Sequence, residues 1–318
     1  MNYSDILRVK ENFQGRDLLS ISDISKEEVL IIFEVAKLLK DMLKRGEPHP
    51  LLQGKSIALL FEKPSTRTRV SFEVGTYQLG AYPLFLSRQD LQLGRGETIG
   101  DTARTLERYV NAIMARVFKQ DTLEELAKYA RIPVINGLSD KEHPCQALGD
   151  FFTLWERGEL KKEMKFVFLG DGNNVCASLA LLAAKLGVNF LHISPPGYEL
   201  PASIRAKAST EASANGVYSL HTNNPQGGIR DANVIYTDVW VSMGQEEETE
   251  KRKSDFLPYQ LNQSLLKLAS PDVKVMHCLP ARRGEEITDE VMDGPHSIIF
   301  DQAENRLHIQ KAILALLV

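Results

Sequence analysis

The sequence is poor in cysteine. Its three cysteines, Cys145, Cys176 and Cys278, are scattered, and none belongs to a CxxC pair or to a Cys/His cluster with the spacing of zinc ligands. A disulfide framework is therefore excluded, no metal site is predicted, and a reducing compartment is favoured.

Excess charge and long apolar runs are also missing. The 38 basic and 42 acidic side chains leave a formal net charge of −4, which gives no bulk electrostatic reason to bind DNA, RNA or acidic membranes. No apolar run approaches the roughly 18 residues that span a bilayer, and the polar start MNYSDILRVKENFQG has no secretory core. We predict a cytoplasmic protein with no nucleic-acid or membrane partner, or an organellar one if a transit peptide has been removed.

The composition is that of a folded globular protein. The chain has 318 residues, 43% hydrophobic and 25% charged, which predicts two domains of ordinary size. Short apolar runs alternate with helical patterns, as in repeated βαβ units. The predicted fold class is α/β, with two domains that each contain a mainly parallel sheet flanked by helices.

Turn residues and periodicity locate the elements. A capping box at Ser25–Glu28 predicts a helix that ends before Gly46. Other helices are expected near 65–80, 100–110, 122–130, 144–155 and 174–187. Strands are expected over 56–61, 83–86, 113–117, 133–135, 165–169, 190–193, 234–237 and 273–276. Residues 245–253 are interpreted as a charged surface loop.

The domain division places the first domain at residues 1–148 and the second at 149–302. A last helix is expected over residues 302–317. The pattern alone allows this helix either to cover the second sheet or to return to the first domain. The predicted domain division assigns residues 303–318 to the first domain.

The segment Ser65-Thr66-Arg67-Thr68-Arg69 follows a strand and opens a helix. Free N–H groups and the positive end of a helix dipole favour an anion there, and hydroxyls with a guanidinium match a tetrahedral phosphate. An ordinary serine N-cap followed by exposed arginines explains the segment equally well. No Walker motif is present, so a P-loop is excluded.

His143 stands before a proline at the expected start of a helix. A histidine at an N-cap tends to stay neutral and can donate a hydrogen bond to a carbonyl oxygen. A lone histidine is more often structural.

Three expected strands of the second half end in polar residues. The turn Gly170-Asp171-Gly172-Asn173-Asn174 lacks the third glycine of a dinucleotide fingerprint, because Val175 stands there, so a nicotinamide dehydrogenase is disfavoured. Asn174, Asp238 and Cys278 still fall where open α/β sheets bind ligands. Cys278 is either a nucleophile, for which no His–acid pair is evident, or a small buried side chain.

Taken together, these segments resemble the aspartate/ornithine carbamoyltransferase family along nearly the whole chain. The resemblance rests on STRTR at 65–69, Arg116, HPCQ at 143–146, GDGNN at 170–174, DVWVSMG at 238–244, HCLP at 277–280 and QAENRLH at 302–308. Seven motifs in the correct order make coincidence negligible.

The resemblance implies that the first domain binds carbamoyl phosphate and the second an amino-acid acceptor. The implied catalytic residues are Arg116, His143 and Cys278. The implied carbamoyl phosphate ligands are Ser65, Thr66, Arg67, Thr68, Gln92, Arg116, His143, Gln146, Cys278, Leu279 and Arg306. The implied ornithine ligands are Asn174, Asp238, Ser242 and Met243. Among the acceptors of the family, the SMG loop at 242–244 favours ornithine.

The family also implies a homotrimer, alone or within a higher assembly of trimers, in which Gln92 of a neighbouring chain completes each phosphate site. The implied reaction is attack by the neutral δ-amine of ornithine on carbamoyl phosphate, with no metal or organic cofactor. The alternatives are a transferase for a related amine such as putrescine, and a non-catalytic relative that acts as a binding partner. Arg282, in the loop after Pro280, departs from the residues common in the family.

Overall fold

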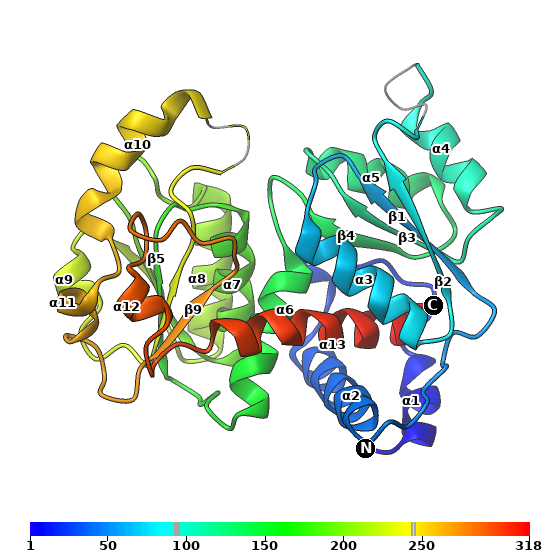
Figure 1. Cartoon of the computed structure of the whole chain (residues 1–318), viewed down its shortest axis with the longest axis horizontal. Coiled ribbons are helices and arrows are strands. Elements are labelled where there is room, and N and C mark those ends of the chain that lie inside the picture. The colour runs from blue at the N-terminus through cyan, green and yellow to red at the C-terminus, as the bar shows by residue number, and fades with distance from the viewer. Residues whose placement is uncertain (92–95, 243, 245) are drawn as a thin grey trace. The chain divides into compact units, whose positions relative to one another are not determined.

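The computed structural model describes residues 1–91, 96–242, 244 and 246–318, and it divides into two compact units (Figure 1). Unit 1 comprises Met1–Phe152 and Asn305–Val318, and unit 2 comprises Thr153–Glu304. Among the helices of the described ranges, none is long and apolar enough to cross a bilayer.

Unit 1 is built on a four-stranded parallel sheet with the order β2-β1-β3-β4. The two central strands, β1 and β3, are buried on both faces, which is why they appear in the sequence as nearly continuous apolar runs, whereas the edge strand β2 is only partly buried. The elements are α1 (Tyr3–Lys10), η1 (Ile21–Asp23), α2 (Lys26–Lys44), β1 (Ser56–Phe61), α3 (Thr66–Gln78), β2 (Tyr82–Ser87), α4 (Ile99–Leu106), β3 (Ala112–Arg116), α5 (Gln120–Tyr129), β4 (Val134–Leu138) and α6 (Pro144–Glu156).

Helix α2 forms as its sequence predicts. The Ser25 side chain accepts from the backbone N–H of Glu28, and the Glu28 side chain accepts from the backbone N–H of Ser25. The apolar positions that follow helical spacing are buried: Val29, Ile32, Phe33, Ala36 and Leu39.

The last helix, α13 (Ile299–Leu317), packs against unit 1 through its C-terminal part. Lys40 on α2 donates to the Asn305 side chain at 2.7 Å, and the Gly15 N–H donates to the Leu317 carbonyl at 2.9 Å. A side chain at Gly75 on α3 would crowd α13, because a Cβ built there would lie 3.1 Å from the Lys311 side chain. Residues Asn305–Val318 of this helix accordingly belong to unit 1.

The division between the units falls after Phe152, whereas the sequence placed it after residue 148. Helix α6 runs through this boundary, and its Phe152 ring lies 5.8 Å from the ring of Phe33 on α2. Aromatic packing therefore keeps about one further turn of α6, residues 149–152, in unit 1.

Unit 2 contains a five-stranded parallel sheet with the order β7-β6-β5-β8-β9. Val167, Ile193, Ile235 and Val275 share one core with Phe256. The elements are β5 (Lys165–Leu169), α7 (Asn174–Leu186), β6 (Asn189–Ile193), α8 (Ala202–Ala214), β7 (Ser219–Thr222), α9 (Pro225–Gly228), β8 (Val234–Thr237), η3 (Glu246–Glu248), α10 (Thr249–Phe256), η4 (Leu257–Tyr259), α11 (Gln263–Leu266), β9 (Lys274–His277) and α12 (Asp289–Met292). The two sheets confirm the predicted fold class.

One prediction in unit 2 is wrong. Residues 245–253 were expected to form a charged loop, but the described part of this stretch contains η3 and most of α10. The helix buries Arg252 and Phe256, which are one turn apart, and the pair of opposite charge Lys251–Asp255 supports its exposed side. Its apolar face is too narrow to stand out in a run of glutamates and lysines.

Candidate functional site

The first group of candidate residues lies at the carboxyl edge of the sheet of unit 1. Ser65 is the N-cap of α3, and its Oγ accepts from the Thr68 N–H at 3.3 Å. The Thr68 hydroxyl accepts from the Ser65 Oγ at 3.1 Å and from Arg306 Nη2 at 2.8 Å. A residue from α13 thus joins the turn that follows β1.

This turn gathers positive charge and free donors. Thr66 is exposed, while Arg67 is half-buried and its Nε is buried without a hydrogen-bond partner among the described residues. Arg116 is buried at the end of β3, in register with the last residue of β1, Phe61. Burial and then the Arg116 charge lower the pKa of Lys63, which follows β1. The edge therefore suits an anion rather than a cation.

His143 directly precedes α6, as predicted. Its carbonyl accepts from the N–H groups of Gln146 and Ala147, the backbone role of an N-cap residue. Burial, followed by the charges of Arg306 and Arg116, holds the pKa of His143 well below its ordinary value. The imidazole is therefore neutral at neutral pH and has one N–H to donate.

Gln146 is held one turn into α6. Its Nε2 donates to Asp150 Oδ1 at 2.8 Å, and both side chains are buried. Because the amide nitrogen is directed to that carboxylate, the amide oxygen is the part of Gln146 that can accept from a ligand.

The second group lies at the carboxyl edge of the sheet of unit 2. Asn173 is the N-cap of α7, and it donates through Nδ2 to Asp238 Oδ2 at 2.8 Å. Asn174 begins the helix, and its side-chain oxygen accepts from the Val175 N–H at 2.9 Å. The glycine-rich turn thus supports an aspartate on the neighbouring strand, β8.

Asp171 in the same turn forms an ion pair that sequence reasoning missed. Arg252 on α10 donates to Asp171 at 2.8 Å, and both side chains are largely buried. Burial raises the pKa of Asp171, and the Arg252 charge opposes that shift only in part. The two residues are far apart in sequence, and the polar composition around Arg252 gave no sign of the contact.

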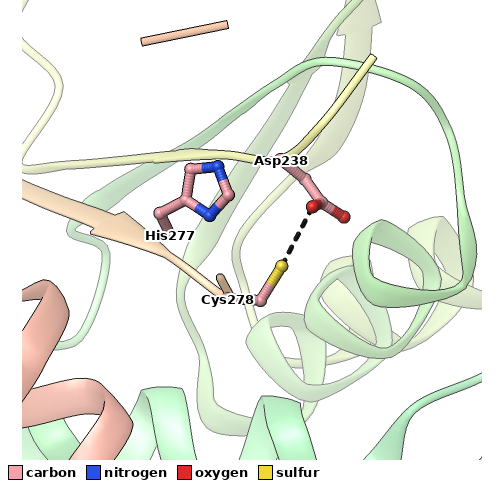
Figure 2. A group of neighbouring side chains, drawn as sticks. All are labelled: Asp238, His277 and Cys278. Carbon is pink, nitrogen blue, oxygen red and sulfur yellow. Dashed lines mark hydrogen bonds between the residues drawn. The ribbon is translucent and has the colours of Figure 1, made fainter. Parts of the chain in front are cut away.

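Asp238 and Cys278 meet where β8 and β9 end side by side (Figure 2). The Cys278 thiol donates to Asp238 Oδ1 at 3.0 Å, and the Val239 N–H donates to the same oxygen at 2.8 Å. Asp238 is only 6% exposed, so its carboxylate presents acceptor oxygens in a sheltered place. Such a group suits an ammonium or another hydrogen-bond donor.

The side chains of Asp238, His277 and Cys278 lie within 4.8 Å of one another, close enough to be tested as metal ligands (Figure 2). Both ring nitrogens of His277 already make hydrogen bonds, one with Glu286 at 2.9 Å and one with the Leu279 N–H at 2.9 Å. A metal would have to displace one of them, so the imidazole is poorly suited to be a ligand.

The structure thus brings several predicted residues into two groups. Ser65, Thr68 and Arg306 are in contact in unit 1, and Asp238 contacts Cys278 in unit 2. Ser242 is half-buried beyond β8. Gln92 and Met243 fall outside the described residues. The acid partner that the sequence did not reveal near Cys278 is Asp238 itself.

The chain is thus a two-unit α/β protein whose candidate residues are a basic turn that suits an anion in unit 1 and a carboxylate beside a thiol in unit 2. Models of two domains match the chain: the "Aspartate/ornithine carbamoyltransferase, carbamoyl-P binding domain" at residues 16–156, and the "Asp/Orn binding domain" of the same family at residues 162–317. The chain belongs to the aspartate/ornithine carbamoyltransferase family.

Similar proteins have closely matching lengths. An ornithine carbamoyltransferase of Pyrococcus abyssi is 54% identical over 306 residues, 96% of each chain. One of Methanosarcina mazei is 55% identical over 299 residues, 94% of this chain and 98% of the relative. The solved structure of ornithine carbamoyltransferase from Pyrococcus furiosus has a TM-score of 0.93 at 54% identity, covering 96% of this chain and 97% of that one.

Proposed function

We propose that this chain transfers the carbamoyl group of carbamoyl phosphate to the δ-amine of L-ornithine, giving L-citrulline and phosphate. The observation that carries the proposal is the presence in one chain of a group suited to each substrate: the basic turn at Ser65–Thr68 in unit 1 and the Asp238–Cys278 pair in unit 2. Relatives named ornithine carbamoyltransferase match nearly the full length.

Carbamoyl phosphate is assigned to unit 1. Arg67 and the N–H groups and hydroxyls of the turn at 65–68 hold the phosphate, where a helix N-terminus and a guanidinium favour a dianion. Arg116 and neutral His143 donate to the carbamoyl oxygen. Arg306 donates a hydrogen bond to Thr68, and its charge acts on His143. The amide oxygen of Gln146 accepts from the carbamoyl nitrogen. The family resemblance alone assigns the backbone carbonyl of Leu279 to the same nitrogen.

Ornithine is assigned to unit 2. Asp238 accepts the α-ammonium, and Asn174 binds the carboxylate near the start of α7. Ser242 and Met243 complete the acceptor site, and Cys278 lies beside the δ-amine.

The reaction then needs little covalent chemistry from the protein. The neutral δ-amine attacks the carbamoyl carbon, the C–N bond forms, and the tetrahedral intermediate expels phosphate as the C–O bond breaks. Donors from Arg116 and His143 stabilise the oxyanion, and the departing phosphate takes the proton that the amine loses. No residue has to serve as a general base.

An acceptor panel tests this proposal. Acceptor-dependent release of phosphate from carbamoyl phosphate, the product common to every acceptor, should be fastest with ornithine and slow with putrescine, aspartate and acetylornithine. Preference for putrescine would support a sister transferase instead. Loss of activity with every amine would indicate a non-catalytic relative, which the presence of Arg67, His143 and Cys278 disfavours.

The proposed assembly is a homotrimer in the cytoplasm, with Gln92 of one chain reaching the phosphate site of its neighbour. A Gln92→Glu chain would place a negative charge beside that phosphate and should be poorly active. Mixing it with an Arg67→Ala chain should restore activity, because some sites in the hybrid trimers have both residues intact. Confirmed hybrids without activity would show that Gln92 does not act across chains.

The Pyrococcus furiosus relative, 55% identical over 302 residues (95% of this chain, 96% of the relative), is named anabolic, which supports a role in biosynthesis.

A further inference from the structure

A buried histidine and a buried glutamate lie behind the loop that follows β9, and the proposed reaction uses neither of them. His277 is the last residue of the strand, and Glu286 lies nine residues later. His277 Nε2 and Glu286 Oε1 are 2.9 Å apart, and both side chains are 0% exposed. Buried polar pairs of this kind need a reason, because removing them from water is costly.

The hydrogen bonds of the His277 ring fix which nitrogen carries its proton. The backbone N–H of Leu279 lies 2.9 Å from Nδ1. A backbone N–H can only donate, so Nδ1 holds a lone pair and the ring proton is on Nε2. The Nε2–H therefore donates to Glu286, and a proton on Nδ1 would break the contact with Leu279.

Glu286 makes a second contact with the same loop. Its Oε1 also accepts from the Arg282 N–H at 2.7 Å. Its own backbone carbonyl accepts from the Leu261 N–H at 2.8 Å, and the adjacent Ile287 bridges to Leu261 in the core. The carboxylate is therefore fixed to the body of unit 2, and it holds the loop at residue 282 directly and at residue 279 through the imidazole.

The loop needs this support because of what it carries. Leu279 has a φ of +59°, in the left-handed region that residues other than glycine rarely adopt. Its neighbour Cys278 donates to Asp238 at 3.0 Å. The Leu279 carbonyl and the Cys278 thiol are both proposed contacts of the reacting groups. Their positions therefore depend on a backbone conformation that is intrinsically unfavourable and needs support from other residues.

We propose that His277 and Glu286 are positioning residues that fix Cys278 and the Leu279 backbone for carbamoyl transfer, a role that rests on the function proposed above. Neither side chain touches the substrates. They act through the loop, in the way that hydrogen-bonded partners behind an active site orient the groups in front of them. Small displacements of such groups reduce turnover more than binding.

Substitution of Glu286 tests the role, with Glu285 as a matched control. Glu286→Ala should lower kcat for citrulline formation by at least about tenfold while the KM values stay nearly constant. Glu286→Gln should recover most of kcat, because its amide oxygen can accept both N–H groups. Glu285→Ala removes a neighbouring carboxylate that pairs with two side chains, Lys253 at 2.9 Å and Arg282 at 3.7 Å, rather than with the loop backbone, and it should leave kcat unchanged.

Two His277 variants keep the test decisive if Glu286→Ala does not fold. In His277→Asn the side-chain oxygen can still accept from the N–H two residues on, whereas His277→Leu has no acceptor. The asparagine variant should retain more of kcat than the leucine variant. Equal values, or a Glu286→Ala enzyme that loses only thermal stability and keeps its kcat, would overturn the proposal.

The wild-type protein provides an independent reading. Nitrogen-15 NMR of labelled histidine should show the His277 ring proton on Nε2 at neutral pH, and a proton on Nδ1 would overturn the proposal. Glu286→Ala should shift the ring toward a mixture of tautomers. If the wild-type protein made no citrulline, the proposed function would fail, and the tautomer would still report whether the pair forms.

Discussion

The two units use the same architecture for opposite electrostatic tasks. Each has a parallel sheet whose carboxyl edge carries the candidate side chains, and each places an N-cap residue beside them, Ser65 in unit 1 and Asn173 in unit 2. In unit 1 the edge collects arginines and hydroxyls, and in unit 2 it presents the Asp238 carboxylate and a thiol. The fold therefore provides a place for a ligand, and the charge of a few side chains decides whether that ligand is a phosphate or an ammonium.

The largest expected effect concerns the basic edge. Arg67→Ala should lower kcat/KM by about 1,000-fold, because a doubly charged phosphate loses its guanidinium in a partly dry site. Initial rates measure the loss, and circular dichroism should be unchanged. Arg45→Ala is the control, since Arg45 is an exposed arginine of the same unit paired with Glu47. An Arg67→Ala enzyme with wild-type constants would remove the phosphate assignment.

The second prediction concerns the ammonium at the other edge. An alkyl amine such as the δ-amine of ornithine titrates near the lysine value of about 10.4, so its neutral fraction rises about 100-fold between pH 6 and pH 8. The value of kcat/KM for ornithine should rise with it. His143 stays neutral over this range because its pKa is held low, so its titration does not counteract the rise of kcat/KM with pH. A flat profile would contradict attack by the neutral amine.

The third prediction separates two thiols of unit 2. Cys278→Ala should weaken ornithine binding and turnover by about tenfold, the loss of one or two hydrogen bonds, and spare carbamoyl phosphate affinity. Cys176 is buried in α7, and burial raises the pKa of its thiol well above the ordinary value, so Cys176→Ala should change stability alone. A Cys278→Ala defect confined to carbamoyl phosphate would move that residue to the other substrate.

The last effect is on stability rather than on activity. Burial lowers the pKa of His192 to about 4, and its Nε2 donates to the Gly170 carbonyl at 2.9 Å. Because the unfolded chain takes up a proton near pH 6.5 and the folded chain only near pH 4, this residue stabilises the folded state above pH 6.5. Its contribution falls by about 1.4 kcal/mol per pH unit as pH drops through that window.

Urea unfolding at pH 7, 5.5 and 4.5 measures this dependence. His192→Gln keeps a donor for Gly170 and cannot titrate, so it should lose less stability than wild type between pH 6.5 and pH 4. Parallel losses in the two proteins would assign the acid sensitivity of unit 2 to other groups.

The sequence predicted most of the fold because buried parallel strands are short apolar runs. The strands at Ser56–Phe61, Lys165–Leu169 and Val234–Thr237 have the expected bounds. Prediction failed for α10, whose inward face consists mainly of Arg252 and Phe256. A charged residue at a helical core position cannot be recognised until its partner, Asp171, is known.

The candidate site divides in the same way. Residues that directly follow strands, such as Asp238 and Cys278, were found from their place in the chain. Contacts between segments far apart in sequence were not, as with Arg252 and Asp171 or His277 and Glu286. The contact of Arg306 with Thr68 joins α13 to α3, and the sequence offered only a family resemblance for Arg306. Such pairs depend on how elements pack, which local patterns do not encode.

The contrast between the two edges is tested most directly by the binding of carbamoyl phosphate alone, measured by titration calorimetry on wild type, Arg67→Ala and Asp238→Asn. The account predicts that Asp238→Asn binds it within about twofold of wild type and that Arg67→Ala loses about 100-fold or more, since charged hydrogen bonds to phosphate are lost only in the latter. Carbamoyl phosphate affinity that survives in Arg67→Ala and falls in Asp238→Asn would contradict the assignment of the two substrates to the two units.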